Sequence, residues 1–156
     1  MAEFRVLPSL NRDMAETNAL YVSPADATTP YVKMGRFVYK CIPHPDVARG
    51  TVCMNAIARR ACASTTTIEE FTVPLTATPP KRVCVRAEFV KSKPGPMPEN
   101  LANAIRNALD GLIVSVGQKL TLTHDATAIL FEVTDVDTFG IVNMGTEISV
   151  MWAPSY

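Results

Sequence analysis

Hydrophobic and polar residues alternate along most of this chain, and that pattern predicts short β-strands. In the clearest run, residues 82–90, one face carries Val83, Val85, Ala87 and Phe89. Gly35 interrupts a run rich in β-branched and aromatic residues, which predicts a hairpin or a bulged strand. Runs of the same kind predict strands at residues 18–22, 31–42, 51–57, 71–75, 82–90, 119–123, 128–133 and 147–152.

Residues 99–110 follow a different pattern, which predicts the main helix of the chain. Pro98 suits the first turn of such a helix, and Gly111 suits its C-terminal cap. Apolar residues recur there at helical spacing and form one stripe, made of Leu101, Ile105, Ala108, Leu109 and Leu112.

Two consecutive prolines, at positions 79 and 80, predict a stiff connector between two parts of the chain. The part before it, residues 1–78, reads as short strands and predicts a small β-barrel. The connector covers residues 79–81. Residues 82–156 follow as strand, helix and strands, which predicts an α+β unit. The fold class is therefore mainly β, with α+β character in the second part.

Composition excludes several classes of protein. The chain has 156 residues, of which 47% are hydrophobic and 19% charged, and this excludes a disordered or fibrous chain. No apolar run approaches the roughly 18 residues that a membrane span needs. The first residues show no secretory signal, so we expect a cytoplasmic protein.

Charge is balanced overall but unevenly spread along the sequence. Residues 31–93 carry eleven basic and four acidic residues, whereas the flanking segments are acidic. Such segregation favours a surface that attracts an acidic partner, although solvated strand edges would give the same pattern. A net charge of zero argues against nucleic acid, which basic proteins usually bind.

Motifs for catalysis are missing from the sequence. It has no phosphate-binding P-loop, no dinucleotide fingerprint, no nucleophile elbow and no zinc-protease helix motif. Four cysteines without C-x-x-C spacing and two histidines do not predict a zinc site, and we expect no disulfide. His44 and Asp46 could tune a general base, but a histidine that closes a turn is the favoured interpretation. We therefore expect no enzyme, metal or cofactor in this chain, with a small-barrel enzyme left as an alternative.

Basic residues follow two strands, one on each side of the connector. Arg59 and Arg60 follow the run at 51–57, and Lys91 and Lys93 flank Ser92 after the run at 82–90. If the two parts bring these exits onto one surface, the cations would steer an acidic partner. Two unrelated solubilising clusters would give the same spacing.

Three collinear stretches carry a resemblance to a known family. They are PHPDVARGTVCMNAIARRACAS at 43–64, AEFVKSK at 87–93, and IVSVGQKL at 113–120 followed by FEVTDV at 131–136. Together they resemble the N-terminal domain of N-ethylmaleimide-sensitive factor, the vesicle-fusing AAA ATPase, over roughly residues 17–140. The shared elements include His44-Pro45, Val47, Gly50 and the arginine after an apolar strand.

That resemblance implies a fold and a partner. It implies a double-psi β-barrel subdomain followed by an α/β-roll subdomain, and binding of the SNAP adaptor, which carries the SNARE complex. Ser64–Thr67 replace a glycine-glutamine pair of the family, and Ser92 replaces a lysine, so both positions depart from its pattern. The partner-binding residues that the resemblance implies are Arg59, Arg60, Lys91, Ser92, Lys93 and Arg5.

The same resemblance implies a larger parent protein. We expect a hexameric ATPase that disassembles SNARE complexes in membrane trafficking, with ATP and Mg bound only in modules outside this chain. The fragment itself is then expected to be monomeric, to bind no nucleic acid, and to reach membranes only through its partners. An alternative is the N domain of a segregase-type AAA ATPase, which binds ubiquitin adaptors.

Overall fold

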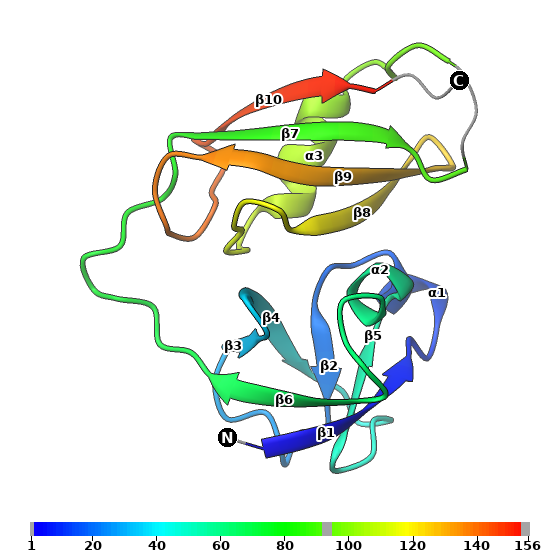
Figure 1. The fold of residues 1–156 in the computed structure, drawn as a ribbon, viewed down its shortest axis with the longest axis vertical. Coiled ribbons are helices and arrows are strands. Elements are labelled where there is room, and N and C mark those ends of the chain that lie inside the picture. Colours follow the sequence, from blue (N-terminus) through cyan, green and yellow to red (C-terminus); the bar gives the residue numbers. More distant parts are fainter. Residues whose placement is uncertain (1, 92–94, 154–156) are drawn as a thin grey trace. The chain divides into compact units, whose positions relative to one another are not determined.

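The computed structural model describes residues 2–91 and 95–153, and it divides the chain into two units (Figure 1). The first unit is Met1–Pro74 and the second is Leu75–Tyr156. Each unit has its own hydrophobic core.

Six strands close the first unit into a β-barrel in the order β1-β5-β2-β4-β3-β6. β1 runs parallel to β5, and β2 runs parallel to β4, while the remaining neighbours are antiparallel. Exchanging β1, β2 and β3 for β4, β5 and β6 reproduces every one of these pairings, so the barrel has an internal pseudo-twofold relation. This topology confirms the predicted double-psi β-barrel. The strands are β1 (Ala2–Pro8), β2 (Leu20–Val22), β3 (Tyr31–Met34), β4 (Phe37–Pro43), β5 (Thr51–Met54) and β6 (Thr65–Glu70).

Alternation along the strands separates two clusters of apolar residues in this unit. One side of the strands fills the barrel with Phe4, Leu20, Val22, Val32, Met34, Tyr39, Cys41, Val52, Met54 and Ile68. The other side packs Tyr21 and Cys53 against Met14 and Val47, outside the barrel. Met14 belongs to the short helix α1 (Arg12–Ala15), whose N-cap is Asn11.

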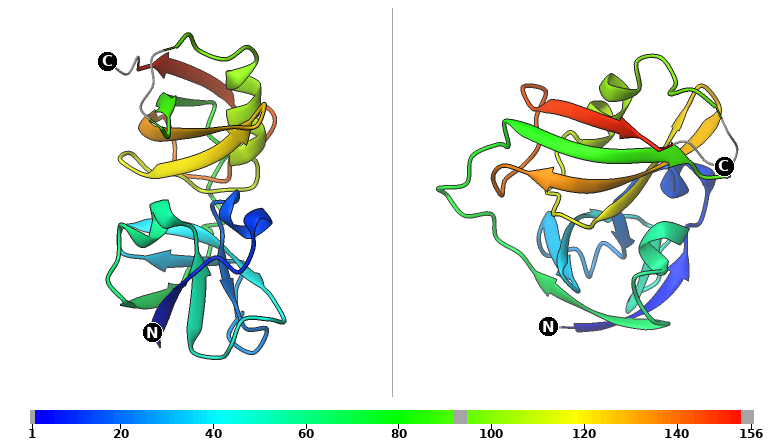
Figure 2. Two further views of the ribbon diagram at one scale, coloured as in Figure 1. Left: turned by 90° about the vertical axis from the view of Figure 1, so that its right-hand side faces the viewer. Right: turned by 45° about the horizontal axis from the view of Figure 1, so that its top comes forward.

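The second unit is a four-stranded sheet with one helix. The sheet has the order β10-β7-β9-β8, and α3 (Leu101–Leu109) lies along one of its faces (Figures 1 and 2). Leu101, Ile105 and Leu109 are fully buried in the core between helix and sheet, which confirms the predicted apolar stripe. The strands are β7 (Arg82–Phe89), β8 (Lys119–His124), β9 (Thr127–Val136) and β10 (Glu147–Trp152).

Three sequence predictions in the barrel unit differ from the structure. The strand predicted at 71–75 does not form, and β6 lies instead at Thr65–Glu70, where no strand was predicted. β6 pairs with β1 and β3 and places Ile68 in the core. Thr65–Thr67 therefore form a strand because they pair with distant strands of the barrel, and not because of their local pattern. The strand predicted at 51–57 ends at Met54, because Asn55 caps the short helix α2 (Ala56–Arg59). β1 was not predicted from the pattern at all.

The predicted connector is hydrogen-bonded into the second unit. Thr146 Oγ1 donates to the carbonyl oxygen of Pro80 at 2.7 Å, and the Asp137 carboxylate accepts the backbone N–H groups of Lys81 and Arg82. The structure divides the chain earlier, between Pro74 and Leu75. Residues 79–81 therefore lie within the second unit, because the segment after β9 supplies partners for their backbone.

Among residues 2–91 and 95–153, no helix is long and apolar enough to cross a bilayer.

Candidate partner-binding surface

The short helix α2 positions the first pair of predicted partner-binding residues. Its N-cap, Asn55, is buried, accepts the backbone N–H of Ala58 at 2.9 Å and donates to the carbonyl oxygen of Thr17 at 2.8 Å. Arg59 is the last residue of the helix and Arg60 its C-cap. The apolar strand β5 and this cap therefore fix the place of both arginines in the barrel unit.

Arg59 is half-buried, and Arg60 and Arg5 are exposed. Within the described part of the chain, no carboxylate lies within 4.0 Å of the guanidinium of any of the three. Arg5 lies on β1 opposite Thr65, and the neighbouring Val6 donates its N–H to the carbonyl oxygen of Ser64 at 2.8 Å. The structure thus places the strand of Arg5 beside the segment that follows Arg59 and Arg60.

The second predicted cluster belongs to the other unit. Lys91 is exposed and lies just beyond the end of β7. Ser92 and Lys93 lie outside the described residues. Convergence of this cluster with Arg59 and Arg60 therefore stays a prediction.

A pocket of about 340 Å³ opens in the barrel unit next to the arginines of α2. One wall is the β3–β4 hairpin, whose turn holds Gly35 at a φ of 64°, and the other is the segment that follows Arg60. No pattern in the sequence indicates this pocket, although Gly35 marks the hairpin that forms one wall. Its lining residues are Met34, Gly35, Arg36, Phe37, Tyr39, Ala61, Cys62, Ala63 and Thr66.

Two arginines, Arg36 and Arg59, lie close to this pocket. The Arg36 guanidinium lies 4.9 Å from the centre of the Phe37 ring, a cation–π contact. Cys62 Sγ donates to the carbonyl oxygen of Arg59 at 3.5 Å, so the thiol is tied to the end of α2. Burial raises the pKa of the Cys62 thiol, and the nearby charge of Arg59 partly opposes that rise.

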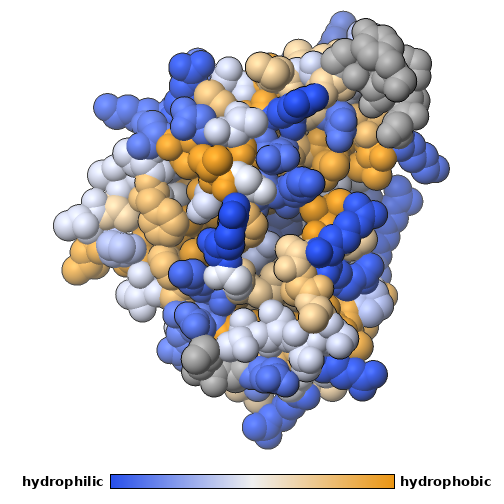
Figure 3. Space-filling view, in the orientation of Figure 1, coloured by the Kyte–Doolittle hydropathy of each residue, from blue (hydrophilic) through white to orange (hydrophobic). Residues whose placement is uncertain are grey.

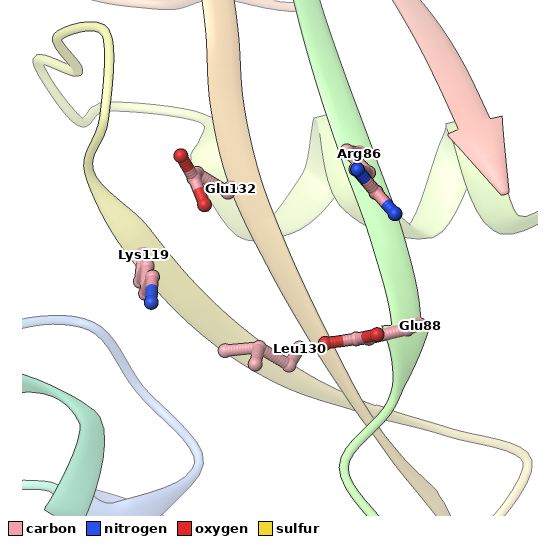
Figure 4. A pocket seen from close by; sticks show the side chains of 5 residues that line it. All are labelled: Arg86, Glu88, Lys119, Leu130 and Glu132. Atoms are coloured by element: carbon pink, nitrogen blue, oxygen red, sulfur yellow. The ribbon is translucent and has the colours of Figure 1, made fainter. Parts of the chain in front are cut away.

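A second pocket, of about 180 Å³, lies on the face of the sheet that α3 leaves uncovered (Figure 4). Arg86, Glu132 and Lys119 are register partners across β7, β9 and β8. Figure 4 shows the Arg86 guanidinium pointing away from Glu132, while the Glu88 carboxylate points toward Leu130. Two cations balance two carboxylates in its lining, so this pocket has no preference for a partner of one sign.

Residues in the stretches that carry the sequence resemblance hold two loops in shape. His44 Nδ1 accepts the N–H of Asp46 at 3.1 Å, which confirms that this histidine closes a turn. Val47 is buried against the outer cluster of the barrel. In the second unit, Gln118 is buried and its Oε1 accepts the N–H of Ser115 at 3.2 Å. These motifs support the fold locally.

The four cysteines are free thiols. Cys41 and Cys53 are buried, while Cys62 and Cys84 are half-buried. Desolvation, with a smaller contribution from Asp26, raises the pKa of Cys41 to about 11. Residues 2–91 and 95–153 contain no group of three His, Cys, Asp or Glu side chains that is placed to hold a metal ion.

The charge segregation along the sequence does not persist in the folded units. The first unit has eight basic and seven acidic residues, and the second has seven basic and eight acidic residues. In hydropathy, the face seen in Figure 3 intersperses hydrophilic and hydrophobic residues. Attraction of an acidic partner must therefore come from local groups such as Arg59 and Arg60, since neither unit carries a strong net charge.

Comparison with known proteins bears on the second unit. Residues 96–154 match the family described as Cell division protein 48 (CDC48), domain 2. No curated protein matches the chain. The match and the barrel fold support an N-terminal domain of an AAA ATPase. They do not distinguish a vesicle-fusing ATPase from a segregase.

Proposed function

We propose that this chain is an adaptor-binding N-terminal module of an AAA ATPase and that it docks an acidic partner through Arg59 and Arg60. The observation that carries the proposal is the pair of arginines at the end of α2, which no described carboxylate neutralises. Charges of this kind steer and orient a partner more than they add to affinity. In this role the module carries no catalysis and needs no cofactor of its own.

The partner that we propose is the SNAP adaptor, with the SNARE complex bound through it. The motif resemblance supports this choice, because His44-Pro45 with Gly50 and the stretch around Gln118 follow the pattern of the vesicle-fusing family. Arg5 and Lys91, together with Ser92 and Lys93, complete the proposed set of contacts. Such a module would work in the cytoplasm, and the hexameric ATPase rings would lie outside this chain.

A ubiquitin-adaptor-binding module of a segregase is the second candidate. The match of residues 96–154 to the family described as CDC48 domain 2 supports an AAA ATPase N domain, and that class includes this candidate as well as the first. Titrating the purified chain with SNAP and with a ubiquitin adaptor separates the two candidates. Saturable binding of SNAP alone supports the first, and binding of the ubiquitin adaptor alone overturns it in favour of the second.

Charge reversal tests the docking site itself. We expect Arg59→Glu to weaken adaptor binding at least about tenfold in calorimetry, since it replaces attraction with repulsion. Arg12→Glu is the matched control, because Arg12 lies in the same unit, is exposed and already pairs with Glu16. Equal affinities for the wild type and Arg59→Glu would refute the proposed site.

A further inference from the structure

The pocket beside α2 has an apolar floor. Met34 and Tyr39 are only 4% and 6% exposed, and the half-buried Phe37 lies between them in sequence. Ala61, Cys62 and Ala63 supply small side chains on the opposite wall. A volume of about 340 Å³ lies within the usual range of ligand pockets, so a side chain of a bound peptide fits such a space.

The rim of this pocket is cationic. Arg36 lines it from the hairpin. Arg59 lies two residues before the wall segment that begins at Ala61, and its carbonyl oxygen accepts a hydrogen bond from Cys62 Sγ in that segment. None of the described lining residues is acidic. The buried groups that titrate are neutral at physiological pH, because burial raises the pKa of Tyr39 to about 12 and also raises that of Cys62. An apolar floor inside a positive rim complements an apolar side chain that is flanked by carboxylates.

We propose that this pocket anchors one apolar side chain of an acidic peptide segment, while carboxylates of that segment contact Arg36 and Arg59. The inference rests on the proposed function, since it names the chemistry of the partner that docks at α2. The anchor supplies affinity by burying apolar surface, and the arginines supply orientation. A partner with carboxylates alone would bury none of the apolar floor of the pocket. The site therefore predicts a partner that carries both an apolar side chain and flanking carboxylates.

Other occupants fit the site less well. A small inorganic anion could contact the arginines but would bury no apolar surface in the pocket, which Met34 and Phe37 line. Nucleic acid would need a broadly basic unit, whereas the barrel unit has nearly equal numbers of basic and acidic residues.

Synthetic peptides test the anchor directly. The sequence Asp-Asp-Leu-Asp-Asp carries both features, Asp-Asp-Ser-Asp-Asp carries only the charge, and Lys-Lys-Leu-Lys-Lys reverses it. In NMR titrations of the full chain we expect the first peptide to shift the amide signals of Gly35, Phe37 and Cys62, and to bind about tenfold more tightly than the second. The third peptide is expected not to bind there. Equal binding of the two acidic peptides, or no shift at these amides, overturns the anchor.

Filling the pocket tests the same inference with the whole adaptor. Ala63 lines the pocket and is exposed, so Ala63→Trp is expected to occupy the space and weaken adaptor binding about tenfold. Ala48→Trp is the matched control, because Ala48 is exposed in the loop before β5. Phe37→Ala, which removes a lining ring, provides a second variant should the tryptophan disturb folding.

The outcomes separate the anchor from the proposed function. If Arg59→Glu abolishes adaptor binding while Ala63→Trp and Phe37→Ala leave it unchanged, the docking role stands and the anchor is wrong. If the leucine peptide binds selectively but no adaptor binds, the anchor stands and the adaptor assignment fails. Oligonucleotide binding that competes with the leucine peptide would overturn the choice of a peptide as occupant.

Discussion

The side chain of Asn55 joins the start of α2 to the carbonyl oxygen of Thr17 through a hydrogen bond of 2.8 Å. The same side chain caps α2 by accepting the N–H of Ala58. Because Thr17 directly follows the α1 turn, one buried amide holds two short helices that are too short to be stable alone. The position of Arg59 depends on this connection.

We therefore expect Asn55→Ala to destabilise the barrel unit by about 2 kcal/mol, through loss of the cap and of the partner of Thr17. Urea unfolding measures the change. Asn11→Ala is the control, because Asn11 caps α1 in the same way but is exposed. A smaller loss for Asn55→Ala than for Asn11→Ala would contradict a connecting role for Asn55.

A second prediction concerns residues 78–81, which precede β7 and include the predicted connector. A Cβ atom on Gly140 would clash with the backbone carbonyl of Thr78, which cannot rotate away as the end of a flexible side chain can. We expect Gly140→Ala to destabilise the second unit by about 1–3 kcal/mol, as overpacking does. Gly145→Ala is the control, since its new methyl group would meet only the side chain of Asn143. Equal effects of the two variants would show that residues 78–81 are loosely attached.

The local pattern of hydrophobic residues was sufficient to predict an element that buries one of its faces. The stripe of α3 and the alternation of β7 were both predicted, because each buries one side against a neighbour. The pattern failed for β1 and β6, since these strands exist by pairing with partners distant in sequence. Propensity is weak there, and Thr65–Thr67 become a strand only when the barrel closes.

The candidate site was predictable only in part. Paired basic residues were visible in the sequence, so Arg59 and Arg60 were found as candidates. The pocket beside them was not visible, because its walls come from the β3–β4 hairpin and the segment after α2, which are joined only by the fold. The charge excess of residues 31–93 was misleading, because both units draw residues from that span.

A third prediction is that the barrel unit loses stability in alkaline solution. Folding raises the pKa of Cys41 from 9.0 to about 11, so the folded state favours the neutral thiol. This contribution is fully present below pH 9 and is lost as the pH rises toward 11. Urea midpoints read from the amide signals of Leu20 and Val52 are expected to fall over that range.

Cys41→Ala should make the fall smaller, because it removes the titrating thiol. Tyr39 contributes at higher pH, since its pKa is raised to about 12. Cys84→Ala, in the second unit, is the control and should keep the full fall of the barrel unit. An identical pH dependence in Cys41→Ala and the wild type would show that Cys41 does not contribute.

The last prediction separates the two parts of the proposed docking site by their response to salt. Exposed charges are screened over about 10 Å at 0.1 M salt, whereas burial of an apolar side chain is not weakened by screening. Adaptor affinity should therefore fall as sodium chloride rises, and Arg59→Glu should flatten that dependence. Ala63→Trp should lower the affinity at every salt concentration and leave the slope unchanged. Calorimetry across a salt series measures both, and a slope unaffected by Arg59→Glu would mean that this arginine does not meet the charge of the partner.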